Sequence, residues 1–192
     1  MRPTRIPRSG PNANPVTDAA ANAATTTAPA GQPATGPFFI GNYELTVDDK
    51  GRLLIPANVR KALDETRDGT SFVLITGSND RLWLYPEHYY RRYVAPTTTD
   101  PVPDADMLDY MLTLFGQADT LTPDKAGRVV LPESSVDREA LGKEVVLIGV
   151  QNHLQLWPRA DWKAYLAEKN KQRPQLASRF KAARAAAANR EA

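Results

Sequence analysis

The stretch Asp48–Arg52 reads DDKGR and is followed by the apolar residues LLI and by Pro56. A second stretch, Asp124–Arg128, reads DKAGR and is followed in the same way by VVL and Pro132. The aspartate, glycine, arginine and proline of the first stretch all recur in the second, each separated from its counterpart by the same number of residues as Asp48 from Asp124. Four landmarks in one order and at one spacing predict an internal repeat.

The repetition continues beyond these stretches. Further landmarks recur at a second constant spacing, the step from position 77 to position 149: Gly77, Leu82, Leu84, Pro86 and Tyr93 return as Gly149, Leu154, Leu156, Pro158 and Tyr165. This spacing is shorter than the first because the first copy carries four extra residues around Thr66 to Thr70, which a loop can absorb. Each copy is predicted to contain a strand, a glycine turn, a strand, a proline-started helix, two strands and a second proline-started helix.

The residues around the first copy predict a β-hairpin with a tight turn. Glu44–Val47 alternates polar and apolar side chains, as a half-buried strand does, and Leu53–Ile55 has the composition of a buried strand. Gly51 can adopt the positive φ that a tight turn requires. Arg52 follows this glycine, so we expect its side chain to project from a rigid strand end. In the second copy Pro123 lacks a backbone donor, which predicts a strand at a sheet edge.

The charged residues of the two turns form the candidate binding site. The candidate contact residues are the cations Lys50, Arg52, Lys125 and Arg128, and the residues expected to support the turns are Asp48, Gly51, Asp124 and Gly127. In one interpretation each aspartate caps its turn and each arginine is a solvated surface charge. Matched basic residues in two copies, within an otherwise acidic region, favour a paired anion-binding surface instead.

Charge and composition divide the 192 residues into three parts. Residues 1–36 have three Arg against one Asp and little to bury, so we expect a disordered N-terminal extension. Residues 37–167 carry 14 basic and 19 acidic residues, a net charge of −5, so a polyanion must meet a local basic patch there. Residues 168–192 carry seven basic and two acidic residues, a net charge of +5. We expect a basic C-terminal tail at 167–192, frayed and solvated, which adds nonspecific attraction to phosphates.

The sequence contains no recognisable motif for catalysis. It has no Cys, no Gly-rich phosphate loop and no H-E-x-x-H motif, and His88 and His153 stand apart and are expected at the surface. Asp100, Asp104, Asp106 and Asp109 do not have EF-hand spacing and are expected to favour the start of a helix over Met107–Phe115. That helix has a broad apolar side and is expected to join the repeats by packing, or to lie at a subunit contact. We therefore expect no catalytic residue, no cofactor and no metal site.

Aromatic residues offer a further alternative. The group Trp83, Tyr85, Tyr89, Tyr90 and Tyr93, partly mirrored by Trp157, Trp162 and Tyr165, could stack on unpaired bases or fill the core. Leu82 and Leu84 alternate with Trp83 and Tyr85, as in a strand packed on both faces, which favours the core. No apolar stretch has the length needed to span a bilayer, so we expect a cytoplasmic protein.

Several of these motifs resemble the MraZ family. They are FIGNY at 39–43, the two D-x-x-x-R turns, IPA at 55–57 with Arg60, LWLYP at 82–86, and KEVVLIGV at 143–150 with Asn152 and Trp157. The resemblance runs from about Phe38 to Leu166. It implies an α+β fold in which two tandem AbrB-like swapped-hairpin repeats form a pseudo-two-fold β-barrel with peripheral helices. It also implies a first AbrB-like domain at 42–88, a helical connector at 89–117 and a second AbrB-like domain at 118–161.

The resemblance also carries functional expectations. It implies a transcriptional regulator of the cytoplasm and nucleoid that binds double-stranded DNA, at tandem short repeats upstream of its own division and cell-wall gene cluster. It implies a ring homo-oligomer, commonly an octamer, and a D-x-x-x-R contact motif at Asp48–Arg52 and Asp124–Arg128. Arg52 and Arg128 are then expected to give specificity, while Lys50 and Lys125 supply sequence-independent attraction. The alternative is a barrel-type protein-interaction module without specific DNA binding.

Overall fold

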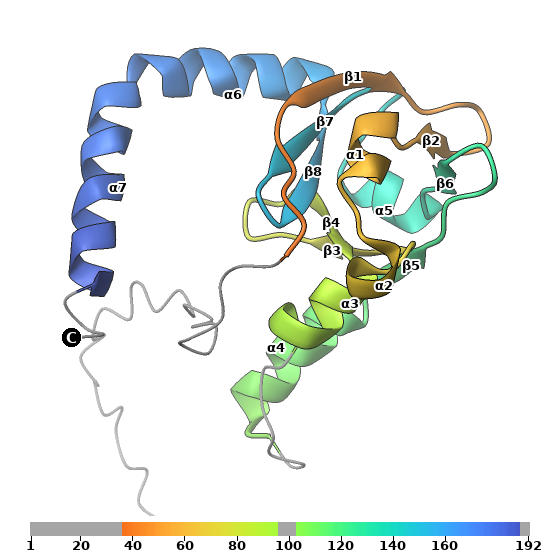
Figure 1. Ribbon diagram of the computed structural model, residues 1–192, viewed down its shortest axis with the longest axis horizontal. Helices are drawn as coiled ribbons and strands as arrows, with labels where there is room; N and C mark the ends of the chain where they lie inside the picture. Colours follow the sequence, from red (N-terminus) through yellow and green to blue (C-terminus); the bar gives the residue numbers. More distant parts are fainter. Residues whose placement is uncertain (1–35, 96–102, 189–192) are drawn as a thin grey trace, which may run out of the picture. The chain divides into compact units, whose positions relative to one another are not determined.

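The same order of elements occurs twice in the chain (Figure 1), in a computed structural model that describes residues 36–95 and 103–188. The first repeat contains β1 (Asn42–Thr46), β2 (Arg52–Leu54), α1 (Ala57–Lys61), β3 (Phe72–Thr76), β4 (Leu82–Pro86) and α3 (Glu87–Tyr89). The second contains β5 (Asp119–Leu121), β6 (Arg128–Val130), α5 (Glu133–Arg138), β7 (Glu144–Val150), β8 (His153–Pro158) and α6 (Arg159–Lys171). The predicted order is therefore confirmed in both copies. The expectations for residues 1–35 and for Asp100 lie outside the described residues.

Proline starts a helix at the same two places in each repeat. The N-cap residues of α1, α3, α5 and α6 are Pro56, Pro86, Pro132 and Pro158, and their φ angles lie between −54° and −61°. A pyrrolidine ring fixes φ in this range and needs no hydrogen-bond acceptor, so the helix starts are set locally by the sequence.

The four-residue insertion is not a loop throughout, because it contributes to the short helix α2 (Glu65–Asp68). The side chain of Asp64 caps this helix by accepting hydrogen bonds from the backbone N–H groups of Thr66 and Arg67. Asp68 is buried, with 1% of its side chain exposed, and its Oδ2 lies 2.7 Å from Nη2 of Arg67. The cap and the paired carboxylate explain why these residues are helical.

The two repeats exchange strands. The larger sheet has six strands in the order β1-β7-β8-β4-β3-β5, and all of its pairings are antiparallel. β1 of the first repeat pairs with β7 of the second, and β5 of the second repeat pairs with β3 of the first. Pro123 comes shortly after β5, which lies at the edge of this sheet, as predicted. Neither repeat therefore completes a sheet by itself.

Equivalent strands of the two repeats pair with each other in a symmetric register. In the second sheet β2 pairs with β6, with Arg52 opposite Val130, Leu53 opposite Val129 and Leu54 opposite Arg128. The repeat spacing converts position 52 into 128 and position 54 into 130, so the register is symmetric about the pair Leu53 and Val129. The pairing of β4 with β8 is symmetric in the same way about Trp83 and Gln155.

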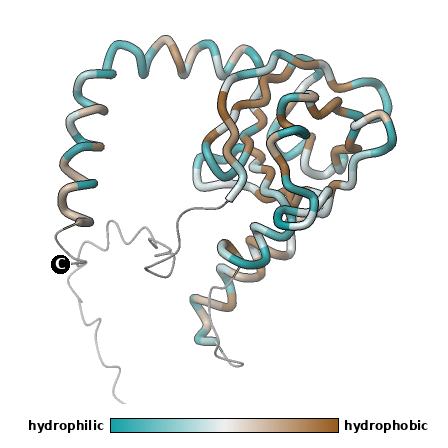
Figure 2. The backbone as a smooth tube through the Cα atoms, in the orientation of Figure 1, coloured by the Kyte–Doolittle hydropathy of each residue, from teal (hydrophilic) through white to brown (hydrophobic). Residues whose placement is uncertain are grey.

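Leu53 and Val129 belong to the largest of the three buried clusters in the described residues. Both are fully buried, and the cluster also takes in alternate residues of β3, β4, β7 and β8, such as Leu74, Leu84 and Leu154. Figure 2 shows the hydrophobic residues concentrated on the strands, while α6 is mostly hydrophilic. The core therefore joins both repeats, which is the physical reason that they fold together.

A second cluster lies on the other face of β3 and β4. Val73, Ile75, Tyr85 and Tyr90 are buried there, and Leu114 and Phe115 of α4 (Ala105–Phe115) pack against them. Trp83 and Tyr89 also pack in this group, so the expectation that the aromatic residues serve the core is confirmed for Trp83, Tyr85, Tyr89 and Tyr90, whereas Tyr165 is 41% exposed. The first turns of α4 are less covered, because Leu108, Tyr110 and Leu112 are 46%, 54% and 61% exposed. A π-helical turn, η1 (Tyr90–Val94), follows α3.

The expectation of a surface position for His153 is wrong. Its side chain is buried and its ring stacks on the rings of Trp83 and Tyr85, with centroid distances of 4.4 and 4.9 Å. Burial lowers the pKa of His153 to about 4, so the imidazole is neutral at physiological pH. His88 is exposed, as expected.

The expectation of a frayed C-terminal tail is also wrong. Residues of that region form the end of α6 and a second helix, α7 (Arg173–Ala188), whose run of alanines favours helix. The side chains of α7 whose exposure is described are all exposed, which agrees with the expected solvation. Within residues 36–95 and 103–188, no helix has both the length and the apolar character needed to cross a membrane.

Candidate nucleic-acid interface

The turn before β2 is held by the carboxylate of Asp48. Its Oδ1 accepts hydrogen bonds from the backbone N–H groups of Lys50 and Arg52, each at 2.9 Å. Its Oδ2 accepts a hydrogen bond from Nε of Arg52 at 2.7 Å. The backbone closes the same turn, since the N–H of Gly51 donates to the carbonyl of Asp48 and the N–H of Asp48 donates to the carbonyl of Arg52. One side chain therefore fixes both the turn and the arginine.

The turn before β6 repeats this arrangement. Oδ1 of Asp124 accepts from the N–H groups of Ala126 and Arg128 at 2.8 and 2.9 Å, and Oδ2 accepts from Nε of Arg128 at 3.0 Å. Nη2 of Arg128 also lies 2.9 Å from Oδ2. The interpretation in which the aspartate caps the turn is thus confirmed structurally. It does not exclude binding, because a cap that orients an arginine prepares it for a ligand.

The two glycines are required by backbone conformation. Gly51 has a φ of +70° and Gly127 a φ of +82°, in the left-handed region that side chains disfavour. The hydrogen bonds also affect the carboxylates: the backbone N–H of Arg52 is the largest influence lowering the pKa of Asp48 to about 2. The backbone N–H of Arg128, followed by its side chain, lowers the pKa of Asp124 in the same way. Both aspartates are ionised at neutral pH and hold their arginines as ion pairs.

Strand pairing places both arginines on one face. Arg52 and Leu54 alternate with buried Leu53, and Arg128 and Val130 alternate with buried Val129. The side chains of Arg52 and Arg128 are 33% and 40% exposed. Figure 1 shows β2 and β6 side by side, each reached through a loop at the same edge of the fold. We call the outer side of these two strands, with the turns 48–51 and 124–127, the ribbon face.

The arginines keep donors for a ligand. Within the described residues, the only side-chain hydrogen bond of Arg52 uses Nε, which leaves both Nη groups available. Arg128 keeps Nη1 available, because Nε and Nη2 contact Asp124. Lys50 and Lys125 are exposed beside the turns, and neither forms an ion pair within the part of the chain that the structure describes. Such exposed donors suit phosphates and the edges of bases.

Sequence reasoning missed the cation that each turn receives from the opposite repeat. Nζ of Lys143 lies 2.6 Å from Oδ1 of Asp49 in the first turn. Arg60 of α1 lies over the second turn, where a Cβ on Gly127 would be 2.7 Å from its Nε. That Nε donates to the carbonyl of Ile55, and Arg60 forms no ion pair within residues 36–95 and 103–188. The pairing of β1 with β7 and of β2 with β6 brings these residues together across the two repeats, so the linear sequence does not predict their contact.

These additions make the turns electrostatically unequal. The first has three cations, Lys50, Arg52 and Lys143, against two carboxylates, a local charge of +1. The second has Lys125, Arg128 and Arg60 against one carboxylate, a local charge of +2. Both turns are positive although residues 37–167 carry a net charge of −5. The candidate interface is a local basic patch of the expected kind.

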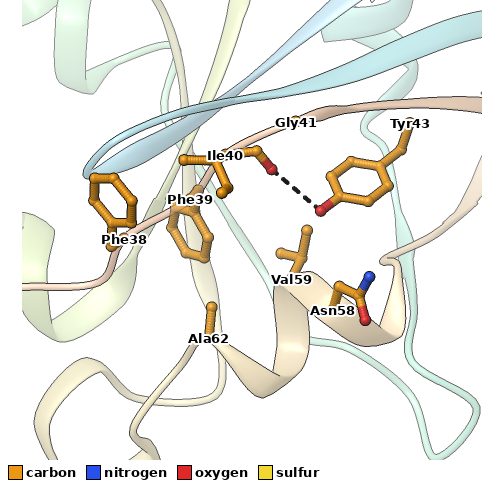
Figure 3. Close-up of a pocket in the computed structure, with 8 residues that line it drawn as sticks. All are labelled: Phe38, Phe39, Ile40, Gly41, Tyr43, Asn58, Val59 and Ala62. Atoms are coloured by element: carbon orange, nitrogen blue, oxygen red, sulfur yellow. Dashed lines mark hydrogen bonds between the residues drawn. The ribbon is translucent and has the colours of Figure 1, made fainter.

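A hollow of about 460 Å³ lies between the start of β1 and α1, and Figure 3 shows its lining. Apolar residues dominate it, including Phe38, Ile40 and Val59. The hydroxyl of Tyr43 donates to the carbonyl of Ile40 at 3.2 Å. Asn58 is the only amide side chain in this lining, which contains no charged residue. Tyr43 is therefore the only titratable side chain in this lining.

Comparison with known proteins gives one consistent result. A family model described as "MraZ protein, putative antitoxin-like" matches residues 38–107 and again residues 114–184. A "Transcriptional regulator MraZ" from Moorella thermoacetica is 33% identical over 143 residues, which are 74% of this chain and 96% of that protein. Proteins of the same name from Salinispora arenicola and Bifidobacterium longum are 34% and 33% identical, covering 68% and 69% of this chain and 89% and 85% of their own lengths.

Proposed function

This chain belongs to the MraZ family of transcriptional regulators, and we propose that it reads promoter DNA with its ribbon face. Membership in this family makes the chain a regulator and not an enzyme. The observation that carries the proposal is the pairing of β2 with β6, because it sets Arg52 and Arg128 on one exposed surface. A two-stranded β-ribbon is narrow enough to enter the major groove of B-DNA.

Within this proposal the arginines read bases and the lysines hold the backbone. Arg52 and Arg128 donate to O6 and N7 of guanine, a contact that distinguishes G from the other bases. Asp48 and Asp124 orient them and keep the turns rigid, with Gly51 and Gly127 supplying the required φ. Lys50 and Lys125 neutralise phosphates, and this part of the affinity falls with salt.

The proposed target is a set of tandem short repeats in the promoter of the protein's own division and cell-wall gene cluster. We infer that the chain assembles as a ring homo-oligomer, with an octamer as the first size to test, in the cytoplasm and nucleoid. Exposed Leu108, Tyr110 and Leu112 on α4 support self-association, as does the apolar hollow beside β1. A ring would present many ribbon faces at fixed spacing, so each further DNA repeat binds as an intramolecular step.

We propose that the two sheets form a pseudo-two-fold barrel of AbrB-like swapped hairpins, which the exchange of β1 and β5 supports. The domain limits 42–88 and 118–161, with a connector at 89–117 and a basic tail at 167–192, remain predictions. So does the assignment of Lys50, Arg52, Lys125 and Arg128 to DNA binding.

The test is equilibrium binding to labelled DNA from immediately upstream of this gene, with a scrambled duplex of equal composition as the control. Fluorescence anisotropy is measured at several salt concentrations for the wild type and for Arg52→Ala/Arg128→Ala. We expect the wild type to prefer the upstream DNA and the double variant to lose that preference while keeping its fold and assembly. Equal binding of both duplexes, unaffected by the substitutions, would reject specific contacts and favour a protein-interaction module.

A further inference from the structure

We propose that Leu54 and Val130 contact the methyl groups of thymines in the major groove, and so contribute to sequence recognition. This inference rests on the proposed function, because it adds two apolar contacts to the same ribbon face. The expectation that Leu53–Ile55 is a buried strand is wrong for Leu54, because Leu54 is 47% exposed while Leu53 and Ile55 are fully buried. The structure separates Leu54 and Val130 from their buried neighbours.

Leu54 and Val130 are exposed although they lie in strands that cross the core. Their exposed fractions are 47% and 59%, whereas Leu53 and Val129, the adjacent residues, are both 0% exposed. Side chains alternate between the faces of a strand, so Leu54 and Val130 share the outer face with Arg52 and Arg128. The two apolar side chains therefore belong to the proposed DNA contact surface.

The register places each apolar residue beside an arginine. Arg52 is opposite Val130, and Leu54 is opposite Arg128. The N–H of Ile55 donates to the carbonyl of Gly127, and the N–H of Leu131 donates to the carbonyl of Gly51. These bonds make Ile55–Gly127 and Gly51–Leu131 hydrogen-bonded pairs. Hydrogen-bonded and non-hydrogen-bonded pairs alternate along an antiparallel ladder, so the neighbouring pairs Leu54–Arg128 and Arg52–Val130 are non-hydrogen-bonded. Side chains are closest in such pairs.

This arrangement matches the chemistry of the major groove floor. The C5 methyl of thymine is the one apolar group that a base pair presents there, and aliphatic side chains recognise it. An arginine that reaches a guanine would bring its neighbouring Leu54 or Val130 against an adjacent base step. Two isolated aliphatic side chains between cations make too small a patch for a stable protein interface, which commonly buries about 800 Å² on each partner.

The experiment removes the methyl groups from the DNA instead of changing the protein. Anisotropy is measured with the upstream duplex and with the same duplex in which deoxyuridine replaces every thymidine, which keeps base pairing and deletes the C5 methyl. The proteins are the wild type, Leu54→Ala/Val130→Ala, and the matched control Leu176→Ala/Val150→Ala. The control truncates one leucine and one valine that are 40% and 37% exposed outside the ribbon face.

We expect the wild type to bind the thymidine duplex more tightly by about fourfold for each methyl contacted, the effect of burying one such group. Leu54→Ala/Val130→Ala should bind both duplexes equally, and the control should keep the wild-type preference. If the wild type binds the thymidine and deoxyuridine duplexes equally, the inference is overturned. The proposed function would still stand in that case, provided that the wild type binds the upstream duplex more tightly than the scrambled one. Retention of the methyl preference by Leu54→Ala/Val130→Ala would also overturn the inference. If the wild type binds the scrambled duplex as tightly as the upstream duplex, both this inference and the proposed function are rejected.

Discussion

Truncation of Leu53 tests the packing that holds the two turns together. Leu53 is fully buried opposite Val129, at the centre of the symmetric register of β2 and β6, whereas Leu54 is 47% exposed one residue later. Leu53→Ala removes about three methyl or methylene equivalents, worth about 2.4 kcal/mol in transfer free energy. A cavity that the paired strands cannot refill adds about 1 to 2 kcal/mol, which gives a loss in unfolding free energy of about 3.4 to 4.4 kcal/mol. Leu54→Ala should cost about 1 kcal/mol or less, because its side chain is half solvated and leaves no cavity.

The assay is urea unfolding followed by circular dichroism, with all proteins at one chain concentration so that any assembly contributes equally. The comparison is internal, because the same substitution is made at adjacent positions on opposite faces of one strand. Equal destabilisation by Leu53→Ala and Leu54→Ala would refute the assigned faces of β2. A loss below about 1 kcal/mol for Leu53→Ala would refute the account of a shared core.

Two further substitutions test local features. Gly149→Ala should lower the unfolding free energy by about 1 to 3 kcal/mol, because its Cβ would lie 2.5 Å from the backbone N of Ile40. Thermal unfolding measures this loss. The control is Gly142→Ala, whose Cβ meets nothing within 4 Å, so it tests only the cost of a positive φ. Asp48 has a pKa lowered from 3.8 to about 2, so it stabilises the fold above pH 3.8 and this contribution is lost as the pH falls toward 2. Asp48→Asn should therefore flatten the loss of stability over that interval in acid titrations followed by circular dichroism, and an unchanged acid transition would contradict the role of the carboxylate.

Much of the fold could be predicted because single residues determine the helix starts and the turns of each repeat. Prolines at 56, 86, 132 and 158 start helices by fixing φ, and Gly51 and Gly127 adopt the positive φ that their turns require. These properties belong to single residues and their neighbours in sequence. The repeated D-x-x-x-R spacing likewise located both turns and indicated the aspartate caps, whereas the side-chain contact of each aspartate with its arginine is seen only in the structure.

Other features depend on contacts between distant residues and could not be predicted. Gly77 and Gly149 are equivalent landmarks, yet Gly77 admits the ring of Trp83 while Gly149 admits the backbone of Ile40. His153 is buried by the aromatic rings of Trp83 and Tyr85 from the first repeat, and nothing in its own sequence neighbourhood, Asn152 and Leu154, indicates those contacts. Arg60 reaches the second turn because β2 of the first repeat pairs with β6 of the second. The residues that the two turns share could therefore be predicted from the repeat, whereas Lys143 at the first turn and Arg60 at the second could not.

The central claim is that both turns lie against the same DNA, and the absence of cysteine from the sequence allows a direct measurement. Lys50→Cys and Ala126→Cys introduce single thiols at equivalent positions of the two turns, and Ala105→Cys introduces one at the exposed start of α4. Each variant is mixed with upstream DNA that carries a thiol-tethered base within one repeat, and disulfide cross-linking is measured. The account predicts that both turn variants cross-link and that Ala105→Cys does not. Bound DNA that cross-links at neither turn, or equally at all three positions, would contradict it.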